Sequence, residues 1–138
     1  MTTELARFSV SMDRQLLEGF NRWVAEEGYP TRSKAVADLV SKALVEHEWT
    51  SGRSVAGAVI MVYDHHKHDL TTRLTHLQHD YHDVIVSSQH VHMDHDNCLE
   101  TVVVRGAPSR VGELVRKLKG TKGVKHTSVA TASTGQGL

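Results

Sequence analysis

The sequence of 138 residues has a single cysteine, Cys98, which excludes an internal disulfide bond. A lone thiol is typical of a reducing cytoplasm, where it is more often a metal ligand, a reactive group or part of the core. The sequence lacks an apolar run near the roughly 20 residues that span a bilayer, and its start lacks the basic flank and apolar core of a signal peptide. The formal net charge is +0, so no global basic field indicates nucleic acid. We therefore expect a cytoplasmic protein without a membrane segment.

Histidine is the residue type in clear excess. Ten of the 11 histidines lie between His47 and His95, and the stretch HVHMDHDNC at 90–98 combines three of them with two aspartates and the cysteine. Histidine is both the commonest protein metal ligand and a pH-sensitive group. This composition fits a metal site or a solvated surface loop, so the choice depends on spacing and on the predicted elements.

The first part of the chain predicts one strand and two helices. Residues 7–12, RFSVSM, alternate between polar and apolar side chains, which indicates a short strand. Asp13 is expected to cap a helix over 14–27, and Gly28 to end it. Ser33 is expected to cap a second helix over 34–49. A unit with one strand has two unpaired edges and a small core, so we expect it to pair with a second copy.

Pairing would duplicate the polar strand face formed by Arg7, Ser9 and Ser11. A two-stranded ribbon fits the DNA major groove, where Arg and Ser bind base edges. Arg32 and Ser33, at the start of the second helix, are expected to bind a phosphate. A solvated strand face explains the first three residues equally well, and the first fifty residues hold six Lys/Arg against eight Asp/Glu. The strand–helix–turn–helix order is more specific, and it resembles the ribbon-helix-helix DNA-binding fold.

The rest of the chain predicts six further elements: strands over 54–66, 83–93, 98–106 and 123–132, and helices over 69–81 and 110–120. Their β-α-β-β-α-β order is that of ferredoxin-like domains, an order shared by small regulatory domains of the ACT type. We therefore expect an α+β protein. Its predicted parts are a ribbon-helix-helix unit at 1–50, a linker at 51–53, an ACT-like domain at 54–133 and a mobile tail at 134–138.

The histidine-rich stretch predicts a set of metal ligands. His90 and His92 are two residues apart on a predicted strand, so they point to the same face. Cys98 begins the next strand, and a hairpin can bring it beside both histidines. Two imidazoles and a thiol make a three-point ligand set, although an exposed hairpin that titrates with pH has the same composition. A fourth ligand is expected near the end of the preceding helix, where spacing leaves His76, His79 and His82 as candidates.

The segments DHHKHDLTTRL, LQHDYHD, QHVHMDHDNCLE and VVVRG, behind a ribbon-helix-helix unit, resemble the NikR family of nickel-responsive regulators over nearly the whole chain. The resemblance implies a square-planar Ni²⁺ site with His90, His92 and Cys98 from one subunit and His79 from a neighbouring one. Nickel accepts a square plane of nitrogen and thiolate donors, whereas zinc prefers a tetrahedron. Because copper generally binds such ligands more tightly, affinity alone cannot select nickel, and the geometry of the site must do so.

Several residues are expected to support this site. Gln78 and Glu100 can orient the ligands or form hydrogen bonds to them, although Glu100 also fits an ordinary strand-face carboxylate. His65 and His95 have counterparts in the family and are candidates for an auxiliary metal site. Most other histidines are expected to be solvated.

Two positions depart from the family or extend its site. Some relatives bind a cation between their domains through two carboxylates; here Lys34 stands at one of those positions, while Asp38 remains as a candidate ligand. Lys67 is expected to contact a DNA phosphate once metal binding orders the segment between His65 and His79.

The resemblance implies a homotetramer in which two ribbon-helix-helix dimers flank four regulatory domains. Nickel would then favour binding to double-stranded operator DNA, and the expected function is repression of nickel-uptake genes. One alternative is a regulator of the same fold that responds to zinc, cobalt or copper. Another is an antitoxin-like DNA-binding protein with an incidental histidine cluster. No organised base, orienting group and oxyanion site accompanies Cys98, so we do not expect an enzyme.

Overall fold

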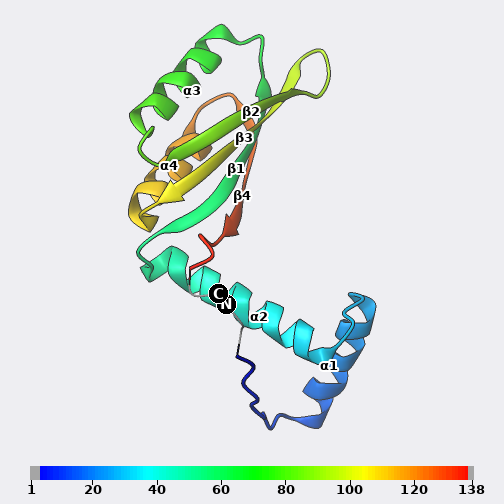
Figure 1. The fold of residues 1–138 in the computed structure, drawn as a ribbon. Coiled ribbons are helices and arrows are strands. Elements are labelled where there is room, and N and C mark those ends of the chain that lie inside the picture. The colour runs from blue at the N-terminus through cyan, green and yellow to red at the C-terminus, as the bar shows by residue number, and fades with distance from the viewer. Residues whose placement is uncertain (1–3, 137–138) are drawn as a thin grey trace. The chain divides into compact units, whose positions relative to one another are not determined.

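The computed structural model describes residues 4–136 (Figure 1). Two compact units divide the chain between Val40 and Ser41, within the second helix. None of the helices in residues 4–136 is both long and apolar enough to cross a membrane. The elements, in chain order, are α1 (Arg14–Glu26), α2 (Arg32–Ser51), β1 (Val55–Asp64), α3 (His68–Asp80), β2 (Ile85–His92), β3 (Asn97–Gly106), α4 (Pro108–Gly120) and β4 (Val124–Ala132).

The ends of α1 are those that the sequence predicts. The carboxylate of Asp13 accepts hydrogen bonds from the backbone N–H groups of Gln15 and Leu16 at 2.8 and 3.4 Å, which satisfies two donors that a helix start leaves free. Gly28 follows the helix at a φ of 74°, a left-handed conformation that glycine adopts without steric cost.

The predicted cap of α2 is wrong. The hydroxyl of Thr31, rather than that of Ser33, accepts a hydrogen bond from the backbone N–H of Lys34 at 3.1 Å. The helix therefore begins at Arg32, and Ser33 lies inside its first turn. Arg32 and Ser33 are both exposed there, beside backbone N–H groups that a first turn leaves without helical partners.

Residues 4–13 form neither a helix nor a strand. The predicted strand over 7–12 is therefore not observed in this chain, because a strand is held by hydrogen bonds to a neighbouring backbone. Its apolar side chains, Phe8, Val10 and Met12, are 73%, 62% and 44% exposed. The two helices are present, but the ribbon-helix-helix unit is not confirmed.

The second unit contains one antiparallel sheet with the strand order β2-β3-β1-β4. With α3 linking β1 to β2 and α4 linking β3 to β4, this is the predicted ferredoxin-like order (Figure 1). Alternate residues of β1 are buried, as period-2 patterning requires for a strand that is covered on one face. They join side chains of α3 and α4 in one apolar cluster, whose larger members include Met61, Tyr63, Leu70, Leu74, Leu114 and Leu118.

The opposite face of the sheet has an apolar, partly buried centre in β1. It consists of Ala56, Ala58, Ile60 and Val62, all with intermediate exposure, with Asp64 at the end of the strand and polar residues among their neighbours on β3 and β4. In β3 it includes Val103, which is 38% exposed. A sheet face in contact with water is normally polar. This composition is typical of a surface that another chain covers.

The last turns of α2 belong to the second unit. The indole N–H of Trp49 donates to the carbonyl oxygen of Ala132 at 3.0 Å, and the ring packs against the apolar cluster. Gly57 in β1 lies directly against this ring, since a Cβ there would come within 2.8 Å of Trp49 and 2.6 Å of the Ala130 carbonyl oxygen. Glycine at 57 thus lets the end of α2 lie close to the sheet.

Candidate metal centre

The hairpin of β2 and β3 places three of the four predicted ligands on one face, and the donor atoms of two of them, His90 and Cys98, lie close together. His90 lies opposite Glu100, and His92 lies opposite Cys98, so all four side chains project from the same face of the hairpin. The register shifts between Ile85 and Ser87, where Val86 forms a bulge in β2. The turn is held by Asp94, whose carboxylate accepts from the backbone N–H of Asn97 at 2.7 Å.

The distance between donor atoms fits a shared metal ion. The Cys98 sulfur lies 3.7 Å from Nδ1 of His90. Two atoms that each bind a metal at about 2.0–2.3 Å lie roughly 3–4.5 Å apart, depending on the coordination angle. Cys98 is buried, whereas His90 and His92 are exposed on β2, an edge strand of the sheet. This position leaves the imidazoles accessible to a ligand from another chain.

A buried carboxylate orients His90. Glu100 is 1% exposed, and its Oε1 lies 2.9 Å from Nε2 of His90. Its other oxygen accepts a hydrogen bond from the side-chain amide of Gln78 at 2.8 Å. If Nε2 of His90 carries the proton that it shares with Glu100, Nδ1 has a free lone pair on the side of Cys98. The structure thus brings Gln78 and Glu100 into contact with each other and with His90.

Tyr63 is part of this network, and the sequence analysis missed it. Its side chain is buried, and its hydroxyl donates to Oε1 of Glu100 at 3.3 Å and lies 3.2 Å from Nδ1 of His90. Burial chiefly, with the nearby charges of Glu100 and Cys98, raises the pKa of this hydroxyl. Tyr63 pairs with Cys98 across β1 and β3. The pairing of β1 with β3 is what brings Tyr63 beside Cys98, and only a predicted strand register could have identified Tyr63 from the sequence.

No side-chain hydrogen bond or ring stacking joins His79 to the hairpin within residues 4–136, although the neighbouring Gln78 reaches Glu100 there. His79 is exposed at the end of α3, where its ring stacks on His82 with centroids 6.0 Å apart. Within residues 4–136, no group of three ligand atoms drawn from His79, His90, His92 and Cys98 lies within 4.8 Å of one another. The exposed His79 ring is accessible from outside the chain.

A row of imidazoles extends from the hairpin. The rings of His92 and His65 are 4.6 Å apart, those of His65 and His66 are 4.1 Å apart, and those of His66 and His95 are 5.1 Å apart. Nε2 of His65 is shielded from solvent and has no hydrogen-bond partner in the described chain. Ligand atoms of His66, His95 and Asp96 lie within 4.8 Å of one another. The candidates His65 and His95 thus lie at the same end of the sheet as His92.

The remaining predicted residues lie outside this cluster. Lys34 forms an ion pair with Asp38 at 2.7 Å, and this hydrogen bond lowers the pKa of Asp38 and raises that of Lys34. Lys67 is exposed before α3, beside an open hollow of about 530 Å³ whose lining includes His68 and Arg73. Arg7, Ser9 and Ser11 are exposed in the segment before α1.

Comparisons with known proteins show the family of this chain. A family model described as "NikR C terminal nickel binding domain" matches residues 56–132. A "Putative nickel-responsive regulator" of Syntrophus aciditrophicus is 46% identical over 97% of this chain and 98% of the relative. One of Desulfovibrio desulfuricans, with the same description, is 50% identical over 97% of both. Among solved structures, uncharacterized protein TM1266 from Thermotoga maritima has the same fold over 58% of this chain and 99% of its own, with a TM-score of 0.52 and 14% identity.

Proposed function

Because the chain belongs to the NikR family of nickel-responsive regulators, we propose that it is a nickel-dependent repressor of nickel-uptake genes. The family is one of regulators rather than enzymes. The observation that carries the proposal is the pairing of His92 with Cys98 and of His90 with the buried Glu100 on one face of the hairpin. This arrangement offers two exposed imidazoles on the edge strand and a buried thiol beside them.

His90, His92 and Cys98 of one subunit and His79 of a neighbouring subunit would hold Ni²⁺. The bound ion would supply a link between two chains and would favour a square plane of nitrogen and sulfur donors. Within each chain, Glu100 holds the His90 ring by its Nε2 atom, and Gln78 holds Glu100. Such outer contacts fix the tautomer and direction of a ligand before the metal arrives.

A homotetramer explains the surfaces that one chain leaves exposed. The apolar face of the sheet and the exposed His79 support contacts between regulatory domains. The exposed Phe8, Val10 and Met12 support pairing of residues 7–12 between two chains, which forms the ribbon of a ribbon-helix-helix dimer. The ribbon would present its polar residues to operator DNA.

The proposed DNA contacts divide into two kinds. Arg7, Ser9 and Ser11 would bind base edges in the major groove and select the sequence. Arg32, Ser33 and Lys67 would bind phosphates and set the position of the protein on the duplex. Nickel must bind the DNA-competent tetramer more tightly than other states, and DNA must raise nickel affinity by the same factor.

Two auxiliary sites complete the proposal. His65 and His95 would belong to a weaker metal site next to the main one, supported by the shielded and unpartnered Nε2 of His65. Asp38 would bind Lys34 in place of the interdomain cation of some relatives, supported by their 2.7 Å ion pair. An operator affinity that does not depend on potassium would agree with this second role.

Operator binding measured across a panel of metals tests the main proposal. Duplexes selected from a random pool with nickel present would be titrated with full-length protein in nickel, zinc, cobalt, copper or chelator. We expect tight binding with nickel and weak binding with chelator. A Cys98→Ser variant should lose the nickel response, whereas His126→Ala, which changes an exposed histidine on β4, should keep it.

The other outcomes identify the alternatives. A response to zinc, cobalt or copper that exceeds the nickel response would indicate a regulator of the same fold with another effector. Equal affinity in nickel and in chelator would indicate a DNA-binding protein with an incidental histidine cluster.

A further inference from the structure

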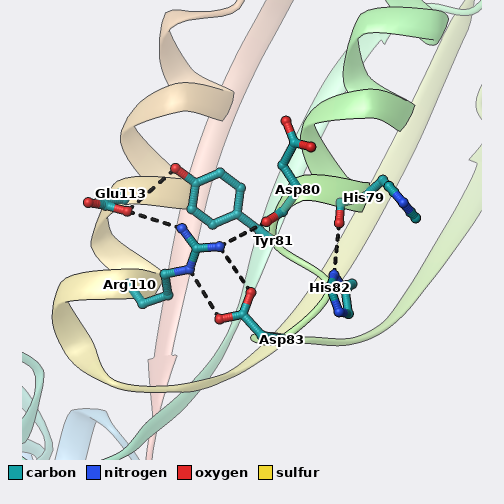
Figure 2. A network of polar contacts seen from close by, with 7 residues as sticks. All are labelled: His79, Asp80, Tyr81, His82, Asp83, Arg110 and Glu113. Atoms are coloured by element: carbon teal, nitrogen blue, oxygen red, sulfur yellow. Dashed lines mark hydrogen bonds and ion pairs between the residues drawn. The ribbon is translucent and has the colours of Figure 1, made fainter.

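Arg110, in the first turns of α4, binds the segment that ends α3 (Figure 2). Its Nε and Nη2 atoms lie 3.1 Å from Oδ2 and Oδ1 of Asp83, respectively. This is a two-pronged pairing of guanidinium and carboxylate, which fixes direction as well as distance. Asp83 lies 27 residues before Arg110 in the sequence, so this contact joins two elements rather than bracing one helix.

The same guanidinium makes three further contacts. Nη2 donates to the backbone carbonyl oxygen of Asp80 at 2.8 Å. The guanidinium carbon lies 4.0 Å from the ring centroid of Tyr81, which is buried. Nη1 lies 3.4 Å from Oε2 of Glu113, an oxygen that also accepts from the Tyr81 hydroxyl at 3.5 Å. One side chain thus holds residues 80, 81 and 83 at once.

The segment held in this way carries His79. The final carbonyl groups of a helix have no helical donors, and its last turn is where helices fray. Asp80 is the last residue of α3, and Arg110 donates to its carbonyl. Figure 2 shows the His79 imidazole pointing away from Arg110, so the two side chains do not touch and any influence passes through the backbone.

We propose that Arg110 is a positioning residue for the metal centre: through Asp80, Tyr81 and Asp83 it fixes the end of α3, so that His79 is already placed for the hairpin of the neighbouring subunit. This inference rests on the proposed function, because it assigns His79 as the ligand that crosses between chains. A ligand that is already ordered loses less conformational entropy when the metal binds, so its affinity is higher.

The chain offers a matched control at the other end of α3. Arg73 donates to the backbone carbonyl oxygen of Lys122 at 3.1 Å, and its Nε lies 3.4 Å from Asp69. Like Arg110, it is a partly exposed arginine that joins α3 to a distant backbone carbonyl. Arg73→Ala therefore removes a comparable surface contact without releasing the last turn of the helix.

Nickel affinity of the full-length protein, measured by competition with a chelator, is the first test. Removing a residue that supports a ligand typically weakens metal binding by about 10–100-fold, and we expect Arg110→Ala to fall in this range. Arg110→Lys should recover little of the loss, because an ammonium cannot form the two-pronged pair. Asp83→Asn, which keeps the Asp80 and Tyr81 contacts, should give an intermediate loss, and Arg73→Ala should change affinity less than about 3-fold.

The metal-free protein gives an independent measurement. Backbone amide exchange of residues 80–83 should be faster in Arg110→Ala than in the wild type, and unchanged in Arg73→Ala. The amide of Tyr81, which donates to the carbonyl of Gln78 at 3.1 Å, is the most direct reporter. Similar exchange in all three proteins would show that Arg110 does not order this turn, and would overturn the proposal.

A double-mutant cycle decides whether Arg110 acts through His79. Arg110→Ala should weaken nickel binding in the wild type but not in a His79→Ala background. An equal loss in both backgrounds would assign Arg110 a general structural role and overturn the inference, while leaving the proposed function intact. A wild-type protein that binds no nickel, or a His79→Ala variant with wild-type affinity, would instead contradict the proposed ligand set and with it the role of Arg110.

Discussion

The unit that ends at Val40 and the unit that begins at Ser41 differ in how their apolar residues are covered. In the second, residues of the sheet, α3 and α4 form one buried cluster within a single chain. In the first, Val24 and Ala35 are buried, while Phe8, Leu16 and Leu39 are 73%, 64% and 44% exposed.

This difference in coverage shows two ways in which a sequence can specify a fold: through contacts within one chain, or through contacts with another. The patterning of the second unit is satisfied inside one chain, so its secondary structure and core follow from that chain alone. The patterning of the first unit favours a second copy, because exposed apolar side chains gain stability only when another surface covers them. The core between the sheet and its two helices should therefore form without a second chain, whereas the first unit, and the open face of the sheet in the proposed tetramer, should gain stability from one.

Leu114→Ala should give the largest change. Leu114 is fully buried in the cluster beneath the sheet, and replacing such a leucine by alanine costs about 2–5 kcal/mol of the free energy of unfolding. Denaturant titration of the second unit should show this loss at every protein concentration. A loss that disappears at high concentration would contradict the view that this core is complete within one chain.

Phe8→Ala should give the next largest change, which should affect the stability of the dimer rather than that of the core within one chain. If the ring is buried between paired strands, its removal should cost about 1.5–3 kcal/mol of dimer stability. Sedimentation or thermal unfolding over a range of concentrations should show the midpoint moving, because association contributes to stability by mass action. A shift that does not depend on concentration would mean that residues 7–12 are covered within one chain.

Trp49→Phe should lower the stability of the second unit by a smaller amount. Because Trp49 lies in α2, the change would also show that the end of this helix belongs to the second unit. Loss of the hydrogen bond to the Ala132 carbonyl should lower the free energy of unfolding by about 0.5–1.5 kcal/mol. The decrease should appear in the same unfolding transition as that of Leu114→Ala. Trp23→Phe in α1 is the control, and it should leave that transition unchanged.

The smallest expected effects are on two carboxylates, one in each unit. Hydrogen bonds, from Arg110 to Asp83 and from Lys34 to Asp38, are the chief reason that the pKa of each carboxyl is lowered. A lowered pKa adds stability above the ordinary value of about 3.9, and this is lost as the pH falls through the folded value. In NMR titrations, Arg110→Ala should raise only the pKa of Asp83, and Lys34→Gln only that of Asp38.

Local patterns predicted most of the fold. The alternation in β1 and the stripe of α4 were clear because each lies within one element, and the Asp13 cap depends on contacts two and three residues away. The α2 cap was predicted at the wrong residue because Thr31 and Ser33 have the same chemistry, and only backbone geometry selects between them.

The parts that the sequence did not reveal depend on contacts between distant residues. Tyr63 joins the site through its pairing with Cys98, which depends on the strand register. Arg110 reaches Asp80 and Asp83 across 30 and 27 positions. The pairing of residues 7–12 with a second copy and the role of His79 at a neighbouring hairpin stay predictions, because both concern contacts with a further chain.

The bulge at Val86 determines which face of β2 carries the proposed metal ligands. Ile85 pairs with Val104, so regular alternation from Ile85 would pair His90 with Leu99 and His92 with Asn97, on the face opposite Cys98. The extra residue inverts this phase for the rest of β2. If β2 kept all its residues but paired without the bulge, His90 and His92 would point to the other face, away from Cys98. If Val86 were deleted instead, the regular pairing would still place both histidines beside the thiol. The proposed site therefore depends on the number of residues between Ile85 and the histidines, as well as on the identity of those residues.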